Sequence, residues 1–278
     1  MLYRTHKMSL TGLFIFLMML VLVAPSSPFA REMTATEVMV KVDNFDDGET
    51  SSSEMTMILI DRRGNQRVRQ MRGFRKDYGE DTKSMNFFLS PADVRNVAFL
   101  SYDWDDEDKE DDSWLYLPAI GKPKRISAGN QKDSFMGSDF TYADMNDLEI
   151  NEWDYKFLKQ SEMVDGKDCW VIEGVPKKSK RKKVIDETGY LKVVSWIRKD
   201  IFFVVKGKMY VKKGKKIKYF TASELEPIQG IWTAKKLTMV TTKRKRKEHS
   251  TVLLFNKVVY NKGVEDGMFT VQRMERGL

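Results

Sequence analysis

The sequence predicts a mainly β, antiparallel fold, in which a meander of short strands curls into a barrel or part of a barrel. Short β-prone runs follow one another at short, even spacing, and tight-turn residues stand between them. No repeat of solenoid length is evident. Of the 278 residues, 41% are hydrophobic and 12% are aromatic, which is enough for a folded chain with a sizeable core.

One helix precedes the strands. In residues 34–45, Thr34 is placed to cap the helix and Glu37, three residues later, completes a capping box. Strands then follow, with a hairpin turn at Arg62–Asn65. The strands expected in the first half are Met55–Ile60, Gln66–Lys76, Thr82–Leu89, Val97–Tyr102 and Trp114–Leu117.

The second half continues the pattern. Turn signals stand at Asp165-Gly166, Lys213-Gly214, Gln229-Gly230 and Lys262-Gly263. The strands expected between them are Tyr155–Val164, Cys169–Val175, Leu191–Arg198, Phe202–Val211, Ile217–Leu225, Gly230–Thr241, Thr251–Tyr260 and Phe269–Met274.

Two runs, Met55–Ile60 and Phe202–Val205, are apolar on both faces. In an antiparallel sheet this pattern means either that both faces are covered or that one face lines an apolar cavity. The 17 methionines suit an adaptable apolar surface. They suit an ordinary core equally well, and at this point both interpretations stay open.

The N-terminus has the order of a secretory signal peptide. Arg4 and Lys7 precede an uncharged run from Met8 to Val23, and small residues follow up to Ala30. The run is short for a membrane-spanning helix. We therefore expect a signal peptide at residues 1–30, cleaved after Ala30 or Ser26, and one exported domain at 31–278 in the periplasm. No cysteine lies near the cleavage point, so we expect no lipid anchor on this protein.

Catalysis is poorly supported. The two histidines are His6 and His249, and Cys169 is the only cysteine. Outside the signal peptide, one histidine and one cysteine cannot build most triads or histidine-based metal sites. Cys169 lies in a β-prone run, which predicts a buried thiol. We expect no enzyme activity, no catalytic residues and no cofactor.

The sequence contains one acidic run and two basic runs. The acidic segment Asp103–Asp112 lacks the register of a calcium loop, so we expect a solvated hairpin tip and no metal. Two basic runs lie at 177–183 and 243–247. Because a signal peptide precedes these runs, we expect no nucleic-acid partner. Hairpin tips that face solvent, or transient docking onto anionic headgroups at a membrane surface, remain.

The segments Trp114–Ser127 and Asp133–Met145 have neither strand nor helix periodicity. Aromatic residues alternate with small ones, and Gly137 permits an unusual backbone conformation. Ser138 or Asp139 is placed to cap a helix that begins in 141–146. Two interpretations remain: a loop packed on itself, or a lid in which Phe135, Met136 and Phe140 close the mouth of an apolar cavity.

These two motifs resemble the bacterial outer-membrane lipoprotein-sorting family, relatives of the periplasmic lipoprotein carrier LolA. The similarity continues through Val194–Ile197, Leu225–Thr233 and Phe269–Gly277 and covers nearly all of residues 31–278. The resemblance implies an incomplete, strongly curved antiparallel β-barrel of about eleven strands (LolA/LolB-like), with short helices closing the open side and a cavity for acyl chains. No arginine is assigned an acyl-binding role.

From the resemblance we expect a non-enzymatic carrier that transfers lipids or lipoprotein acyl chains toward the outer membrane. The alternative is a periplasmic sensor or an accessory subunit of an RND-type export permease. Lysine and arginine at the cavity rim would steer anionic headgroups. The residues expected to bind lipid or form the lid are Trp114, Tyr116, Phe135, Met136, Gly137, Phe140 and Tyr142, and those expected to steer headgroups are Lys122, Lys124 and Arg125.

Overall fold

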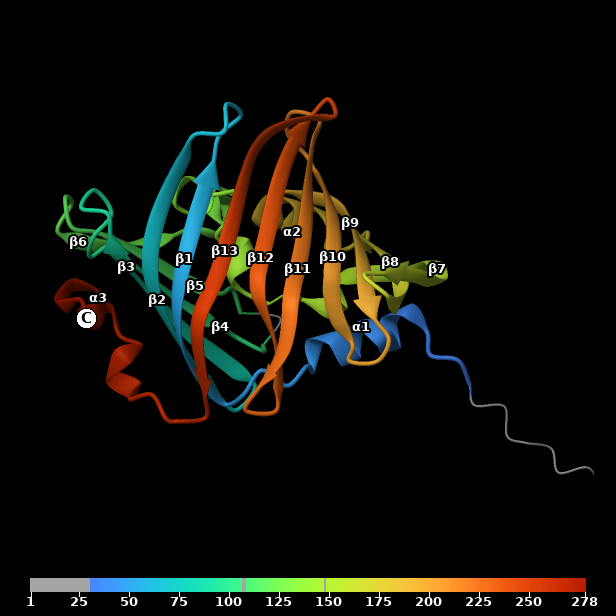
Figure 1. Cartoon of the computed structure of the whole chain (residues 1–278), viewed down its shortest axis with the longest axis horizontal. Helices are drawn as coiled ribbons and strands as arrows, with labels where there is room; N and C mark the ends of the chain where they lie inside the picture. Colours follow the sequence, from blue (N-terminus) through green and yellow to red (C-terminus); the bar gives the residue numbers. More distant parts are fainter. Residues whose placement is uncertain (1–30, 107–108, 148) are drawn as a thin grey trace, which may run out of the picture. The chain divides into compact units, whose positions relative to one another are not determined.

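Two antiparallel meanders meet in one open sheet in the computed structural model, which describes residues 31–106, 109–147 and 149–278. Residues 33–278 form one compact unit. The described strands follow the order β6-β5-β4-β3-β2-β1-β13-β12-β11-β10-β9-β8-β7. β1 and β13 join the two meanders, as Figure 1 shows by the neighbouring pale blue and red strands.

The strand bounds are as follows: β1 Thr50–Ile60, β2 Gln66–Tyr78, β3 Asp81–Ser90, β4 Ala98–Asp103, β5 Asp112–Leu117, β6 Lys122–Ile126, β7 Trp153–Val164, β8 Lys167–Pro176, β9 Tyr190–Arg198, β10 Phe203–Val211, β11 Lys216–Ile228, β12 Ile231–Lys243 and β13 Arg246–Tyr260. The helices are α1 Ala35–Asp43, α2 Arg181–Thr188 and α3 Val271–Arg276, with 3-10 turns η1 Ala128–Asn130, η2 Phe135–Gly137, η3 Ala143–Met145, η4 Ile150–Glu152 and η5 Asp266–Met268.

The mainly β, incomplete antiparallel sheet with short helices is therefore confirmed. The capping box of α1 is also confirmed, because Glu37 N donates to Thr34 Oγ1 and Thr34 N donates to the Glu37 carboxylate. The sheet has thirteen strands among the described residues, two more than the resemblance implied. The expected signal peptide at 1–30 lies outside the described residues.

Four local predictions were wrong or incomplete. Residues 269–274, expected as a strand, begin helix α3, because the Thr270 side chain caps Arg273 N and the helix buries Met274. The basic run at 177–183 leads into α2 instead of forming a hairpin tip, and strand β6 was not expected. Residues 141–146 hold only the 3-10 turn η3, which has no side-chain cap from Ser138 or Asp139; beside it, Thr141 N donates to the Asp144 carboxylate and Asp144 N donates to Thr141 Oγ1.

The connection between β6 and β7 explains how the open side is closed. These two strands form opposite edges of the sheet, so residues 127–152 must cross from one edge to the other. The crossing segment contains η1 to η4 and packs Phe135 and Phe140 into the largest hydrophobic cluster, together with Met55, Met57 and Leu59 of β1. We call the sheet face that carries this cluster the inner face.

The other face of the first meander has its own cover. Alternate residues of a strand point to opposite faces, and Met85, Phe87 and Leu100 form a second cluster under the C-terminal segment, with Phe269 and Met274. Tyr102 Oη donates to the Phe269 backbone carbonyl at 2.7 Å. Among the described residues, no helix has the length and apolar character needed to cross a membrane.

Candidate functional site

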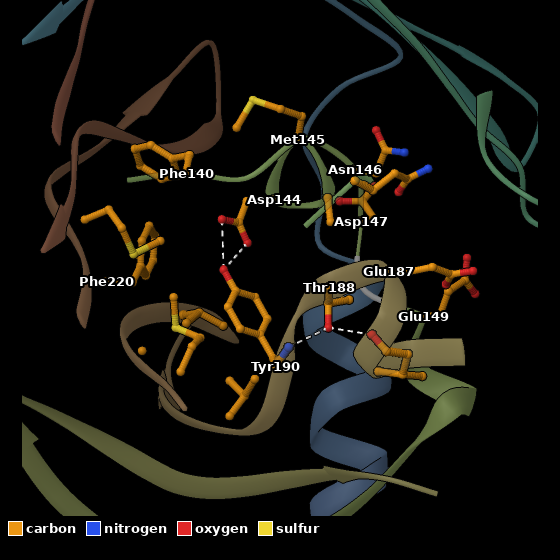
Figure 2. A pocket seen from close by; sticks show the side chains of 18 of the residues that line it. Phe140, Asp144, Met145, Asn146, Asp147, Glu149, Glu187, Thr188, Tyr190 and Phe220 are labelled. Atoms are coloured by element: carbon orange, nitrogen blue, oxygen red, sulfur yellow. Dashed lines mark hydrogen bonds between the residues drawn. The ribbon is translucent and has the colours of Figure 1, made fainter. Parts of the chain in front are cut away.

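An apolar pocket of about 400 Å³ lies between the inner face of β9 to β13 and the crossing segment. Its strand walls are Val193, Met209, Phe220, Leu237, Met239 and Leu253, and the opposite wall includes Phe140, Met145, Trp153 and Val184. Figure 2 shows Phe140, Met145 and Phe220 around this space. Met145, Met209 and Met239 line this pocket, and Met209 and Met239 also belong to the inner hydrophobic cluster, so the methionines form both cavity surface and core.

Carboxylates line the same pocket beside the apolar side chains. They belong to Asp111, Asp144, Asp147, Glu149, Glu152 and Glu187. Burial, with Glu152 adding to it, raises the pKa of Glu187 to about 7. Glu152 is 3% exposed and forms an ion pair with Lys183 at 3.0 Å, so this buried carboxylate has a cationic partner. The pocket therefore combines an apolar interior with an acidic margin.

A buried polar group fixes one wall of the pocket. Tyr190 Oη donates to Asp144 at 2.7 Å, and the Lys218 ammonium donates to the same hydroxyl at 3.2 Å (Figure 2 shows the Tyr190–Asp144 contact). Burial lowers the pKa of Lys218 and raises that of Tyr190 well above its usual value. This arrangement joins η3 of the crossing segment to β9 and β11, so the pocket wall is held by hydrogen bonds as well as by packing.

Two further hollows continue the pocket along the inner face. The first, of about 520 Å³, shares Met145, Asp147 and Leu237 with the apolar pocket and adds the hydroxyls of Ser84 and Ser101. The second, of about 480 Å³, shares Asp147 and is lined mainly by carboxylates. The polarity of the lining thus changes along the inner face from apolar, through hydroxyl groups, to acidic.

Part of the acidic segment is not the solvated hairpin tip that was predicted. Asp103, Asp111 and Glu149 are partly buried and place carboxylate oxygens within 4.8 Å of one another. Burial raises the pKa of Asp103, with the Asp111 charge adding to it, and burial also raises the pKa of Asp111. Oxygens at this spacing have the chemistry that hard cations prefer. A proton bound to one of these carboxyls would reduce the repulsion between them as well as a cation would.

The lid segment, Ser134–Thr141, is a tight loop that hydrogen-bonds to itself. Phe135 N donates to the Phe140 carbonyl at 2.8 Å, and Ser138 N donates to the Phe135 carbonyl at 2.9 Å. Met136 and Gly137 have positive φ angles of 49° and 76°, which confirms the unusual backbone predicted at Gly137. The Phe135 side chain is 1% exposed and its ring lies 5.2 Å from that of Phe99.

Two anchors hold the lid segment to the sheet. Arg69 of β2 is 7% exposed and donates from Nη1 to the Met136 carbonyl at 2.7 Å. At the other end, the Asp139 carboxylate accepts from Thr251 Oγ1 at 2.8 Å and lies 2.7 Å from His249 Nδ1. Both anchors are polar groups in largely buried surroundings, where a hydrogen bond is costly to lose.

The structure separates the residues predicted to bind lipid into two groups. Phe135, Met136, Phe140 and Tyr142 pack in the inner cluster, and of these Phe140 lines the apolar pocket. Trp114 and Tyr116 of β5 pack instead with the C-terminal cluster on the other face. Lipid binding by any of these residues stays a prediction.

The residues predicted to steer headgroups lie on β6. Lys122, Lys124 and Arg125 are exposed at one edge of the sheet, and none of them is among the residues that line the apolar pocket. Arg125 forms an ion pair with Asp112. A steering role for the three would therefore act from the sheet edge, and it also stays a prediction.

Cys169 and His249 make no hydrogen bond to each other in the described part of the chain. Cys169 is fully buried, as predicted, and burial raises the pKa of its thiol. The ring of His249 hydrogen-bonds to Asp139 and, within the described residues, to no serine, threonine or cysteine. An activated nucleophile needs such a contact with its base.

Sequence reasoning missed three features of this site. Arg69 sits in a strand among other arginines, and nothing in the local pattern distinguishes a buried arginine from exposed ones. The carboxylates of the pocket come from Asp111, Asp144 and Glu187, which lie far apart in the chain. Tyr190 and Lys218 meet only because β9 and β11 flank β10. Lys218 could have been found from the sequence, because it is a cation at an inward-facing position of a predicted strand.

Comparisons with known proteins agree with this fold. A protein-family model whose description reads "Uncharacterized protein" matches residues 80–276. A solved structure of a DUF1329 family protein from Desulfovibrio piger is 31% identical, with a TM-score of 0.77 over 86% of this chain and 97% of that one. No curated protein sequence matches the chain.

Two further solved structures share the fold. An outer membrane lipoprotein-sorting protein domain, as it is described, from Vibrio parahaemolyticus is 29% identical, with a TM-score of 0.76 over 87% of this chain and 98% of that one. A LolA superfamily protein from Nitrosomonas europaea is 18% identical, with a TM-score of 0.63 over 86% and 98%. The resemblance inferred from the two loop motifs is confirmed.

Proposed function

Because this chain belongs to the DUF1329 family and has the fold of LolA superfamily proteins, we propose that it is an exported, periplasmic, non-enzymatic carrier. It binds lipid or lipoprotein acyl chains and transfers them toward the outer membrane. The similar domain from Vibrio parahaemolyticus is described as a lipoprotein-sorting protein, which supports the direction of transfer. Residues 31–278 act as the single carrier domain.

The apolar pocket between β9–β13 and the crossing segment carries this proposal. Side chains of Met, Leu, Val and Phe form most of its strand walls, and its volume of about 400 Å³ is within the range of small-molecule sites. Each methylene group moved from water into such a pocket contributes about 0.8 kcal/mol. An acyl chain therefore gains affinity in proportion to its buried length, which is what a carrier of water-insoluble cargo requires.

The lid segment supplies the opening step. Phe140 contributes to the pocket wall, and the loop is fastened at Arg69 and at Thr251 by hydrogen bonds that can break without unfolding the sheet. Loading then requires both anchors to release, and closure shields the acyl chain from water. In the bound state the lid aromatic groups cover the cargo.

The test compares two neighbouring residues of β11. Phe220→Asp places a carboxylate in the pocket, whereas Tyr219→Asp alters a side chain that is 40% exposed on the other face. Native mass spectrometry of protein purified from the periplasm without detergent should show bound lipid or an acylated protein in the wild type and in Tyr219→Asp, but not in Phe220→Asp. Equal lipid occupancy in both variants, with both folded, would remove the pocket from the proposal.

A second function, an accessory subunit of an RND-type permease or an envelope sensor, is favoured by the edge strand β7. It exposes Leu158 and Met163, with 47% and 63% of their surface accessible, and one side of its backbone is unpaired within the described sheet. Unpaired edges with apolar side chains accept partner proteins. A pull-down with wild-type protein that recovers a permease, and fails with Leu158→Lys, would support this function.

A further inference from the structure

The hairpin tips at one end of the sheet form a strongly basic surface. Three turns take part: β1–β2 at 61–65, β10–β11 at 212–215 and β12–β13 at 243–247. They are brought together because β1 pairs with β13, and Lys216 of β11 pairs with Lys243 of β12. Figure 1 shows these tips together at the upper end of the sheet. We call them the basic tips.

Charge in the basic tips is almost entirely of one sign. The three turns hold ten lysine and arginine residues, and Asp61 is their one acidic residue. All ten basic side chains are exposed. Apart from Lys212, which lies 3.3 Å from Asp186, none has an ion-pair partner within 4 Å in the described chain. Unpaired cations at this density favour an anionic partner, beyond what solubility requires.

The basic tips also enclose a hollow. It is lined by Arg62, Lys243, Arg244, Arg246 and Lys247, with Glu248 as its single carboxylate. The arginine guanidinium groups can bind phosphate oxygens in a bidentate manner. A set of cations around a shallow depression therefore fits a phosphate group better than an extended polymer. Aromatic side chains, which would stack on bases, do not line the hollow.

The lid segment lies beside the basic tips. A small hollow is lined by lid residues, including Gly137 and Asp139, by Lys213 of the basic tips and by His249 next to them. The Asp139 anchor on Thr251 is only a few residues from the β12–β13 turn. Any surface that binds the tips therefore lies next to the loop that closes the apolar pocket.

The opposite end of the sheet is acidic. The hollow there is lined by ten aspartate and glutamate residues and by Arg75. A molecule with a basic end and an acidic end has a preferred orientation in front of an anionic surface, because the acidic end is repelled.

We propose that the basic tips dock this protein onto an anionic phospholipid membrane surface, with the hollow at Arg62 and Arg244 receiving lipid phosphate. The proposal that this surface docks depends only on the charges of the basic tips. Its purpose, which is to present the lid to the membrane for loading or release, rests on the proposed carrier function.

The experiment is vesicle sedimentation with the purified protein. Vesicles contain equal parts of phosphatidylglycerol and phosphatidylcholine, or phosphatidylcholine alone, in low and in high salt. The test variant is Arg62→Gln, Arg244→Gln, Lys245→Gln. The control variant, Lys178→Gln, Arg181→Gln, Lys182→Gln, loses the same net charge from the exposed start of α2. Circular dichroism and thermal unfolding check that both variants fold.

We expect wild-type protein to bind the anionic vesicles in low salt and to be released in high salt. Each basic residue near an anionic surface strengthens binding about fivefold, so the test variant should bind about 100-fold more weakly, and the control variant should bind like the wild type. Equal weakening in both variants would mean that net charge alone acts, and would overturn the proposal. Two other results would also overturn it: binding to phosphatidylcholine vesicles as tight as binding to the anionic vesicles, or a test variant that binds anionic vesicles as tightly as the wild type.

A further binding experiment with a soluble polyanion tests whether the partner is a polymer or a membrane. If heparin or RNA binds to the tips but anionic vesicles do not, the partner is a polymer and the membrane proposal is wrong. Lipid occupancy in native mass spectrometry should be unchanged by the test variant, because Arg62, Arg244 and Lys245 do not line the apolar pocket. Loss of vesicle binding with normal occupancy thus separates failure of docking from failure of the carrier function.

Discussion

The substitution Arg69→Ala should open the lid segment. In the structure the buried guanidinium donates one hydrogen bond to the Met136 carbonyl at 2.7 Å, and it lies 5.8 Å from the centre of the Phe88 ring. A hydrogen bond to a charged group contributes roughly 1.5–3 kcal/mol. Since 1.4 kcal/mol corresponds to a tenfold change in an equilibrium, the substitution should increase the open population roughly 10- to 100-fold. The Asp139 anchor stays intact.

The assay is stopped-flow loading of a fluorescent fatty acid into the protein after its lipid has been removed. If lid opening limits loading, the rate at saturating ligand should rise by a similar factor, and the release rate should rise with it. Arg67→Ala is the matched control, because Arg67 lies on the same face of the same strand, two residues earlier, and is exposed. Thermal unfolding of Arg69→Ala should also show lower stability, because the Met136 carbonyl loses its donor.

A folded Arg69→Ala protein with an unchanged loading rate would refute the reasoning. The lid segment would then be a fixed structural loop, and loading would proceed through another part of the pocket margin. An equal change in the Arg67→Ala control would refute it as well, since net charge, and not the hydrogen bond to Met136, would then control entry.

Three other predictions follow from the same contacts. Phe135→Ala should cost about 3–5 kcal/mol of stability in chemical denaturation because its ring is fully buried, and a cost below about 1 kcal/mol would contradict its place in the core. Glu187 keeps its proton in the folded state up to about pH 7; since the unfolded chain releases that proton near pH 4.3, stability should fall as pH rises between these values, and Glu187→Gln should flatten the curve relative to the exposed Glu265→Gln. A fatty-acid series should gain about fourfold in affinity per methylene group until the pocket is full, measured by displacement of a fluorescent ligand, and a flat series would argue against an apolar site.

The local rules predicted most of the strands because they act between near neighbours. Thr34 and Glu37 are three residues apart, and a capping box needs nothing else. The errors arose where distant contacts decide. The apolar residues of 269–274 suit a strand, yet Thr270 caps a helix there and Met274 is buried by strands that lie far away in the sequence. Local β propensity is weak against burial of that kind.

The candidate site was predictable in its location but not in its chemistry. The motif at 133–145 stood out because it follows neither the period of a strand nor that of a helix, and the structure places it across the inner face, where it forms the lid segment. The acidic margin could not be predicted, because Asp111, Asp144 and Glu187 come together only through the order of the strands and the path of the crossing segment.

The topology itself explains why the loading step should reside in this segment. A sheet whose two meanders meet at β1 and β13 has its sequence-adjacent strands β6 and β7 at opposite edges, so one connection must span the inner face. The strands are fixed by continuous backbone pairing, whereas the crossing segment is held by short 3-10 turns and by separate hydrogen bonds from Arg69, Thr251 and Tyr190. Such elements open at lower free energy than the strands beneath them. A carrier built on this sheet can therefore admit its cargo without disturbing the sheet, provided that the crossing segment is the part that moves.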